Sequence, residues 1–225
     1  MKKYFFIVLI LLLPFLFVFN SCNLLWDKDT TDSISLVSTK PVVKLLGESI
    51  ISMQKGATYK EEGIEAYVGD TLLERGAGQS AWEIESGEVD PNNLGFYVVT
   101  YKAVNGFNWA TYAYRAVLVH DGTPYQQEEI GGDYGIGWFF ETTIEKYEKD
   151  GYWLMSNVWD EEGVVFPIIF AEDNDGSLGI APGVHETKGR YMGTGEFTGD
   201  SIKFILEITS LNGSEIIKEF GWRKD

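Results

Sequence analysis

The stretch "FYVVTYKAVNGFNWATYAYRAVLV", residues 96–119, decides the fold class. Two runs of alternating side chains flank Asn105-Gly106, a residue pair that favours a tight turn between antiparallel strands. Every second residue from Tyr97 to Ala103 shares one face of an extended chain, and so does every second residue from Ala113 to Val119. This pattern predicts a hairpin of two half-buried strands, as in a β-sandwich.

The same turn signal recurs along the chain between short alternating runs. The sequence has 25 glycines and no long run with helical periodicity. Several short strands separated by turn signals predict an all-β protein. The further turn pairs are Asp121-Gly122, Asp150-Gly151, Asp175-Gly176 and Asn212-Gly213.

The C-terminal part, residues 125–225, is predicted to form an antiparallel β-sandwich or a small β-barrel. Pro167 interrupts one apolar run, and a proline cannot donate to the strand ladder, so we expect an edge or a bulge there. The expected strands are Tyr134–Glu141, Tyr152–Trp159, Val164–Ala171, Arg190–Phe197, Asp200–Thr209 and Ser214–Trp222.

The segment at residues 41–121 resembles the bacterial surface immunoglobulin-like (Ig-like) domain. The resemblance implies an Ig-like β-sandwich that acts as a spacer or an adhesion module, and it implies no catalytic residues. It rests on five motifs: Pro41–Gly47, Gly56–Tyr59, Glu62–Ala66, Leu94–Tyr101 and Arg115–Val119.

The N-terminus has the pattern of a secretory leader. Two lysines precede an apolar run of 16 residues from Tyr4 to Phe19, which is shorter than the roughly 20 residues that a membrane-spanning helix needs. Cys22 follows Ser21 and is the only cysteine of the chain, so no intrachain disulfide can form. The context of Cys22 resembles the cleavage box of bacterial lipoproteins. We therefore expect a signal peptide at 1–21, a lipidated Cys22 and a flexible tether at 22–40.

The predicted layout of two β domains behind a lipidated tether resembles accessory lipoproteins of glycan-utilisation systems. That resemblance implies a lipid-anchored protein of the outer membrane that faces the cell exterior. Its expected partners are the membrane, a polysaccharide or oligosaccharide, and outer-membrane uptake proteins. Two alternatives stay open: a structural or adhesion lipoprotein that acts through protein partners, and a small-ligand-binding barrel.

Composition argues against several function classes. The formal net charge is −16, whereas nucleic-acid binding needs a basic surface, so we expect no nucleic-acid partner. A zinc site needs three or four ligands, and the chain offers two histidines, His120 and His185, outside any such cluster. The acidic turn at Asp173–Asp175 lacks the spacing of a calcium loop. We expect no metal, no cofactor and no enzymatic activity.

The tryptophans of the C-terminal part are the candidate ligand-binding residues. In "YWLMSNVW", residues 152–159, Trp153, Asn157 and Trp159 share one face, and the other face carries apolar bulk too. Because only one face of a simple sandwich strand can be buried, an exposed aromatic surface for sugar rings is one interpretation. Trp138 is the fourth candidate. Packing against the first domain or a partner protein explains the same pattern.

Overall fold

The structure is a computed structural model that describes residues 39–76, 78–124, 126–137, 140–173 and 176–225. Residues Thr39–Asp225 form one compact unit. The expected signal peptide, Cys22 and nearly all of the expected tether lie outside the described residues. In the described part, no helix is long and apolar enough to cross a membrane.

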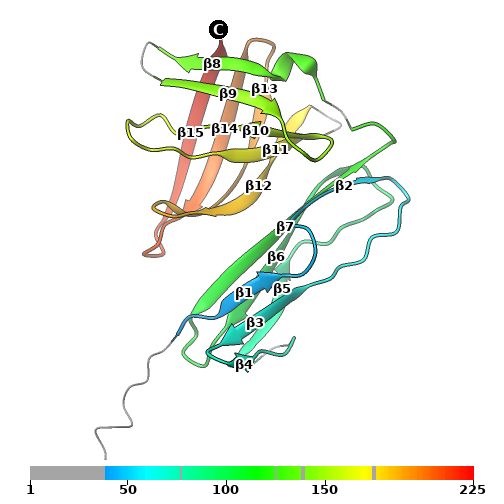
Figure 1. Ribbon diagram of the computed structural model, residues 1–225, viewed down its shortest axis with the longest axis vertical. Helices are drawn as coiled ribbons and strands as arrows, with labels where there is room; N and C mark the ends of the chain where they lie inside the picture. Colours follow the sequence, from blue (N-terminus) through cyan, green and yellow to red (C-terminus); the bar gives the residue numbers. More distant parts are fainter. Residues whose placement is uncertain (1–38, 77, 125, 138–139, 174–175) are drawn as a thin grey trace, which may run out of the picture. The chain divides into compact units, whose positions relative to one another are not determined.

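The first seven strands are β1 (Val42–Leu45), β2 (Ile50–Gln54), β3 (Ile64–Val68), β4 (Thr71–Leu72), β5 (Ala81–Ser86), β6 (Gly95–Val104) and β7 (Ala110–His120). They form a sandwich of two sheets, with strand orders β1-β3-β4 and β2-β7-β6-β5 (Figure 1). Strands β6 and β7 are the predicted hairpin, paired from Gly95↔Val119 to Val104↔Ala110. The predicted Ig-like sandwich is confirmed.

The inward face of this hairpin makes the core of the sandwich. Val99, Tyr101 and Ala103 from β6 and Val117 and Val119 from β7 are all buried, as their alternation predicts. These apolar side chains leave water together, which is the main stabilising contribution to such a core.

Arg115 is a charged member of the same inward face. Its side chain is 1% exposed and ion-paired with Glu61. Its guanidinium also donates to the Tyr101 hydroxyl at 2.9 Å and to the Glu48 carbonyl at 2.9 Å. A buried charge is tolerated where it is paired and hydrogen-bonded in this way. Arg115 therefore fastens β7 to the segment that follows β1.

The remaining strands close into a barrel. They are β8 (Gly132–Ile136), β9 (Phe140–Lys146), β10 (Tyr152–Met155), β11 (Ile168–Glu172), β12 (Ser177–His185), β13 (Gly189–Phe197), β14 (Ser201–Thr209) and β15 (Glu215–Lys224). Each pairs antiparallel with its sequence neighbour, and β15 pairs with β8 to close the ring (Figure 1). The second predicted alternative for this part, a small barrel, is therefore the observed fold.

Three expected strands of the barrel are wrong in their limits, and one strand was not expected. The run expected at Tyr152–Trp159 ends at Met155 in β10, and the run expected at Val164–Ala171 begins only at Ile168 in β11, directly after Pro167. The run expected at Tyr134–Glu141 is divided between β8 and β9, with Gly137 in the left-handed region at φ 61° between them. Strand β12 was not expected, because its sequence contains glycines and Pro182. Its pairing with β13 shifts register between Ile180 and Gly183, which accommodates these residues as a bulge.

The sandwich and the barrel share a small hydrophobic cluster. Leu118 of β7, Tyr152 of β10 and Ala171 of β11 are buried together, with Phe96 of β6 packed against them. The Tyr152 ring lies edge-on to the Phe96 ring at 6.3 Å, and its hydroxyl donates to the Ile51 carbonyl at 3.0 Å.

Two backbone positions of the barrel come very close to the sandwich. A Cβ atom at Gly179 of β12 would lie 2.2 Å from the Phe96 ring, and one at Gly151 would lie 2.4 Å from Leu118. Lys149 adds an ion pair with Glu48 at 2.7 Å. The two β structures are thus in direct packing contact across this cluster.

Candidate functional site

The expected exposed aromatic face on β10 is contradicted by burial. Trp153 is 1% exposed and Trp159 is 6% exposed, and both belong to the barrel core. Trp138 lies outside the described residues. The apolar bulk on the opposite face of β10 has a separate explanation, because Tyr152 packs against the sandwich. Packing against the first domain, one of the two alternatives, is therefore the arrangement observed.

Large side chains fill the barrel interior. Trp153, Phe170, Phe204 and Trp222 come from four different strands, and each is at most 1% exposed. Barrels of eight strands have room for side chains or for one small ligand. These residues fill that room, so the interior gives no support to a small-ligand-binding barrel.

Asn157 organises the loop between β10 and β11 and does not present its amide to a ligand. Its Nδ2 donates to the carbonyls of Trp159 at 3.1 Å and Val164 at 3.2 Å. Its Oδ1 accepts from the backbone N–H of Trp159 at 3.1 Å and of Phe166 at 2.8 Å. These four bonds use both amide hydrogens and both acceptor positions of the side chain.

The ring of Trp159 belongs to the barrel core and is covered by neighbouring side chains. It stacks on Phe166 at 5.4 Å, and the ammonium groups of Lys188 and Lys218 lie 4.5 and 4.0 Å from its ring centroid. Its Nε1 donates to Glu161 at 2.9 Å. A ring with these neighbours has no free face on which a sugar could stack.

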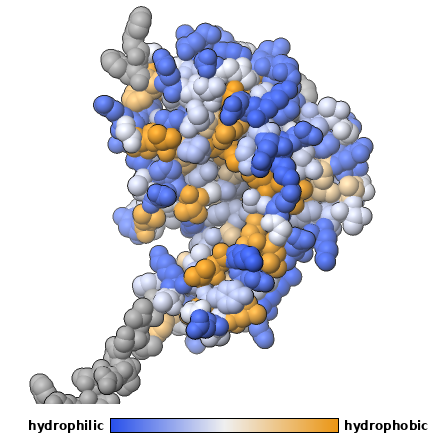
Figure 2. Space-filling view, viewed as in Figure 1, coloured by the Kyte–Doolittle hydropathy of each residue, from blue (hydrophilic) through white to orange (hydrophobic). Residues whose placement is uncertain are grey.

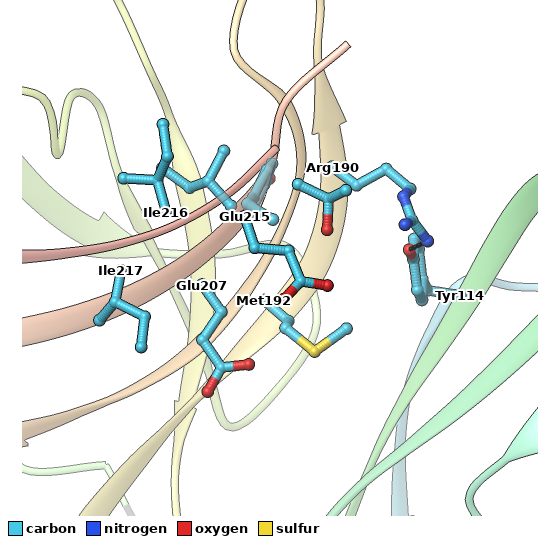
Figure 3. A pocket seen from close by; sticks show the side chains of 10 residues that line it. Tyr114, Arg190, Met192, Glu207, Glu215, Ile216 and Ile217 are labelled. Atoms are coloured by element: carbon cyan, nitrogen blue, oxygen red, sulfur yellow. Dashed lines mark hydrogen bonds between the residues drawn. The ribbon is translucent and has the colours of Figure 1, made fainter. Parts of the chain in front are cut away.

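A surface groove on the outside of the barrel, beside the sandwich, is a candidate site. It has a volume of about 550 Å³ and runs along β13, β14 and β15 up to Tyr114 of the sandwich strand β7 (Figure 3). That volume lies within the ordinary range of ligand sites, which favour domain boundaries. The lining residues are Tyr114, Arg190, Tyr191, Met192, Glu207, Ile208, Thr209, Glu215, Ile216 and Ile217.

The strand register explains how these residues come together. Arg190 of β13 pairs with Thr209 of β14, which pairs with Glu215 of β15. The next outward row, two residues along each strand, is Met192, Glu207 and Ile217. Directly opposed residues on one face of a sheet are neighbours, so the two rows form one continuous surface of mixed polarity.

Arg190 is held in place by two tyrosines of the sandwich. Its guanidinium lies 3.7 Å from the centroid of the Tyr112 ring. Its Nη1 donates to the hydroxyl of Tyr114, which lies beside it in Figure 3, at 3.3 Å. Burial raises the pKa of Tyr114, and the nearby Arg190 charge partly offsets this rise. The remaining donors of Arg190 are therefore presented at a fixed position on the groove.

The two carboxylates of the groove are not neutralised by Arg190. Within the described residues, neither Glu207 nor Glu215 forms an ion pair. Ile216 is 51% exposed and Ile217 is 71% exposed beside them. Figure 2 shows separate hydrophobic patches among hydrophilic side chains on the face in view. The groove thus offers one fixed cation, two acceptors and aliphatic surface.

The histidines have structural contacts. His185 stacks on Phe166 at 4.4 Å, and its Nε2 lies 2.9 Å from the Val165 carbonyl oxygen. The Nδ1 of His120 accepts from the backbone N–H of Gly122 at 3.2 Å. No group of three metal-ligating side chains is found among the residues that the structure describes. Asp175 of the acidic turn lies outside them.

Sequence reasoning missed the groove because it concentrated on aromatic residues. The alternation of "SIKFILEIT", residues 201–209, correctly separates inward Ile202, Phe204 and Leu206 from the outward side chains. The outward set contains Glu207, but its neighbours on β13 and β15 depend on the register of three strands. The signal present in the sequence was the apolar Ile217 at a position that should face water.

Two solved structures are similar to this chain in comparisons of fold. A lipoprotein from Bacteroides thetaiotaomicron is matched over 82% of this chain and 100% of its own chain, at 17% identity and a TM-score of 0.34. A structure of carbohydrate-binding module and INT domains from Clostridium perfringens ZmpB, in complex with GlcNAc, is matched over 81% of this chain and 43% of its own, at 13% identity and a TM-score of 0.29. Both scores are too low for either likeness to bear on the function of this chain.

The sequence comparison gives a firmer result for the sandwich. No curated protein matches the chain. Residues 43–119 match the family model described as "Bacterial surface protein, Ig-like domain". The match covers β1 to β7 with their buried hairpin, the part in which the resemblance was recognised from sequence motifs. Residues 43–119 therefore belong to the bacterial surface Ig-like domain family.

Proposed function

We propose that this protein is a non-catalytic binding lipoprotein of the bacterial cell surface, and that its ligand is a neutral oligosaccharide bound in the groove of β13–β15. Cys22 carries the lipid that anchors it to the outer membrane, facing the exterior. The Ig-like sandwich serves as the spacer. The protein supplies the ligand to a polysaccharide uptake system and does not cleave it.

The main observation in support of an oligosaccharide ligand is that Arg190, Glu207 and Glu215 lie together on one open surface. A sugar hydroxyl both donates and accepts, so it suits fixed guanidinium donors beside carboxylate acceptors. The two carboxylates outnumber the one cation, which disfavours an acidic ligand. The aliphatic side chains of Met192 and Ile217 give the C–H groups of a sugar an apolar contact.

The absence of catalysis is supported by the kind of residues that the site contains. Glycosidases use two carboxyl groups of different protonation state across one bond. The carboxylates of the groove, Glu207 and Glu215, lie in the outward rows of β14 and β15. The sandwich family is likewise a non-catalytic kind.

The test is calorimetry on residues 39–225 with a panel of neutral oligosaccharides, followed by variants against any ligand found. Glu207→Gln should weaken binding about tenfold, because a charge-assisted hydrogen bond becomes a neutral one. Glu141→Gln is the matched control, since Glu141 is an exposed outward residue of β9 outside the groove. Equal affinities of the two variants, or no ligand in the panel, would contradict the oligosaccharide proposal.

A partner protein is the second candidate occupant, and the exposed aliphatics favour it. Ile216 and Ile217 expose 51% and 71% of their surface, and protein interfaces bury such side chains at their centre. A photo-crosslinking residue at position 217 in living cells should then trap an outer-membrane uptake protein. Loss of that crosslink on Glu207→Lys, without loss of thermal stability, is the expected specificity control.

The anchor has a separate test. Cys22→Ala should leave the protein unlipidated, so it should move from the membrane fraction to the soluble fraction or remain as an uncleaved precursor. Metabolic labelling with a clickable fatty acid measures this directly. Labelling of the Cys22→Ala variant at the wild-type level would contradict the proposal.

A further inference from the structure

The exposed large apolar residues of the sandwich gather at one of its ends. Among the described residues of β1 to β7 and their loops, these are Val42 (66% exposed), Leu72 (55%), Phe107 (53%) and Trp109 (46%). We call them the tether-end patch. Isolated exposed apolar residues are common, but a cluster of four at one end, with two aromatics, is a feature of interaction sites.

The sheet register brings the two aliphatic members together. Val42 of β1 pairs with Tyr67 of β3, and Tyr67 pairs with Leu72 of β4, so the three side chains form one row across the sheet. The two aromatic members lie in the turn between β6 and β7. In Figure 1 this turn and strand β4 lie at the same end of the sandwich.

The aromatic turn is fixed to the start of the described chain. The side chain of Asn105 is 2% exposed; its Oδ1 accepts from the backbone N–H of Phe107 and of Trp109, both at 3.0 Å. Its Nδ2 donates to the carbonyl of Thr39 at 2.8 Å. The ammonium of Lys40 lies 5.9 Å from the Trp109 ring centroid. The exposed rings therefore lie directly beside the point where residues 22–38 join the sandwich.

We propose that the tether-end patch contacts the lipid surface to which Cys22 is anchored. This rests on the lipidation of Cys22 in the proposed function. Thr39 follows Cys22 by about 17 residues, so the start of the sandwich can lie no more than about 60 Å from the anchor. Tryptophan prefers the level of the lipid headgroups, and Lys40 beside it suits an anionic surface. The contact orients the sandwich on the membrane.

The test uses residues 22–225, whose only thiol is Cys22. This chain is coupled through Cys22 to vesicles that contain maleimide-headgroup lipid, so the result does not depend on lipidation in the cell. Vesicles with and without a doxyl quencher near the headgroups report the depth of tryptophan. The fluorescence of Trp109→Phe comes from the other tryptophans alone, so its difference from the wild type is the contribution of Trp109. Of the other tryptophans, Trp153, Trp159 and Trp222 are buried in the barrel.

We expect the Trp109 contribution to be quenched about twofold by the doxyl lipid, as for an interfacial tryptophan. A double variant, Val42→Ser with Leu72→Ser, should reduce that quenching. Val184→Ser is the matched control, because Val184 is an exposed aliphatic of the barrel strand β12 that lies outside both the patch and the groove.

Two results would overturn the proposal. One is equal quenching of wild type and Trp109→Phe, with both proteins coupled and folded. The other is loss of oligosaccharide binding in calorimetry on Trp109→Ala with no change in vesicle contact, which would make the patch a sugar site. A failure of Cys22→Ala to alter fractionation in cells would contradict lipidation alone, so the two proposals are separable.

Discussion

Tyr152 gives the sharpest test of the packing between sandwich and barrel, through the substitution Tyr152→Ala. The residue is fully buried between Phe96, Leu118 and the barrel surface, and its hydroxyl bonds to the Ile51 carbonyl. An aromatic side chain of this kind buries on the order of 200 Å². At about 25 cal/mol per Å², its removal from water contributes about 5 kcal/mol as an upper value.

The expected loss of stability for Tyr152→Ala is about 4 kcal/mol, the middle of the range for aromatic-to-alanine changes in cores. Tyr152→Phe should cost about 1 kcal/mol, because it removes only the hydroxyl bond to Ile51. For a chain of this size each kcal/mol lowers Tm by about 2–4 °C, so the alanine variant should melt on the order of 10 °C lower.

The assay is differential scanning calorimetry of residues 39–225. We expect one transition for the wild type, because the sandwich and the barrel share buried residues, and one transition at the lower temperature for Tyr152→Ala. Tyr67→Ala, at a half-buried tyrosine on the sheet β1-β3-β4, is the control. If Tyr152→Ala shifts Tm no more than Tyr67→Ala, the packing of sandwich on barrel described above is refuted.

Three further predictions follow from the burial of particular groups. Trp153→Ala and Trp159→Ala should each lower the free energy of unfolding in urea by about 3–5 kcal/mol and leave the oligosaccharide affinity of the folded fraction unchanged. Unchanged stability with loss of binding would instead identify these tryptophans as ligand-binding residues. Asn157→Ala should cost about 2–3 kcal/mol, since several backbone groups lose their partner; a Tm within one degree of wild type would contradict this. Burial raises the pKa of Tyr134 to about 12, so this group adds stability in full below the unfolded value near 10, and that stability is lost as pH rises toward 12. Urea midpoints at pH 8, 10 and 11 should fall, and Tyr134→Phe should reduce the fall.

The sandwich could be predicted from sequence because its signals are local. The two runs on either side of Asn105-Gly106 contain their own turn and their own alternation, and they pair with each other as β6 and β7. Even Arg115 lies on the inward face that its spacing gives it, although its partly buried partner Glu61 lies far away in sequence.

The candidate site could not be predicted because it depends on contacts between residues that are far apart in the sequence. Trp153 and Tyr152 are adjacent and point to opposite sides, and both are buried because a barrel core lies on one side and the sandwich on the other. The sequence shows apolar bulk on both faces but not what covers each face. The groove in turn depends on the register of β13, β14 and β15 and on Tyr114 from a distant strand.

The glycine at position 179 has a consequence for the thermodynamics of recognition. Since the Phe96 ring occupies the space of a side chain there, the joint between sandwich and barrel gives up its rotational freedom when the protein folds. A ligand that touches Tyr114 on one side and β13–β15 on the other does not have to immobilise two independent bodies. The entropy loss of ordering the sandwich relative to the barrel then occurs on folding and not on binding. Weak contacts along the groove therefore contribute more to the affinity.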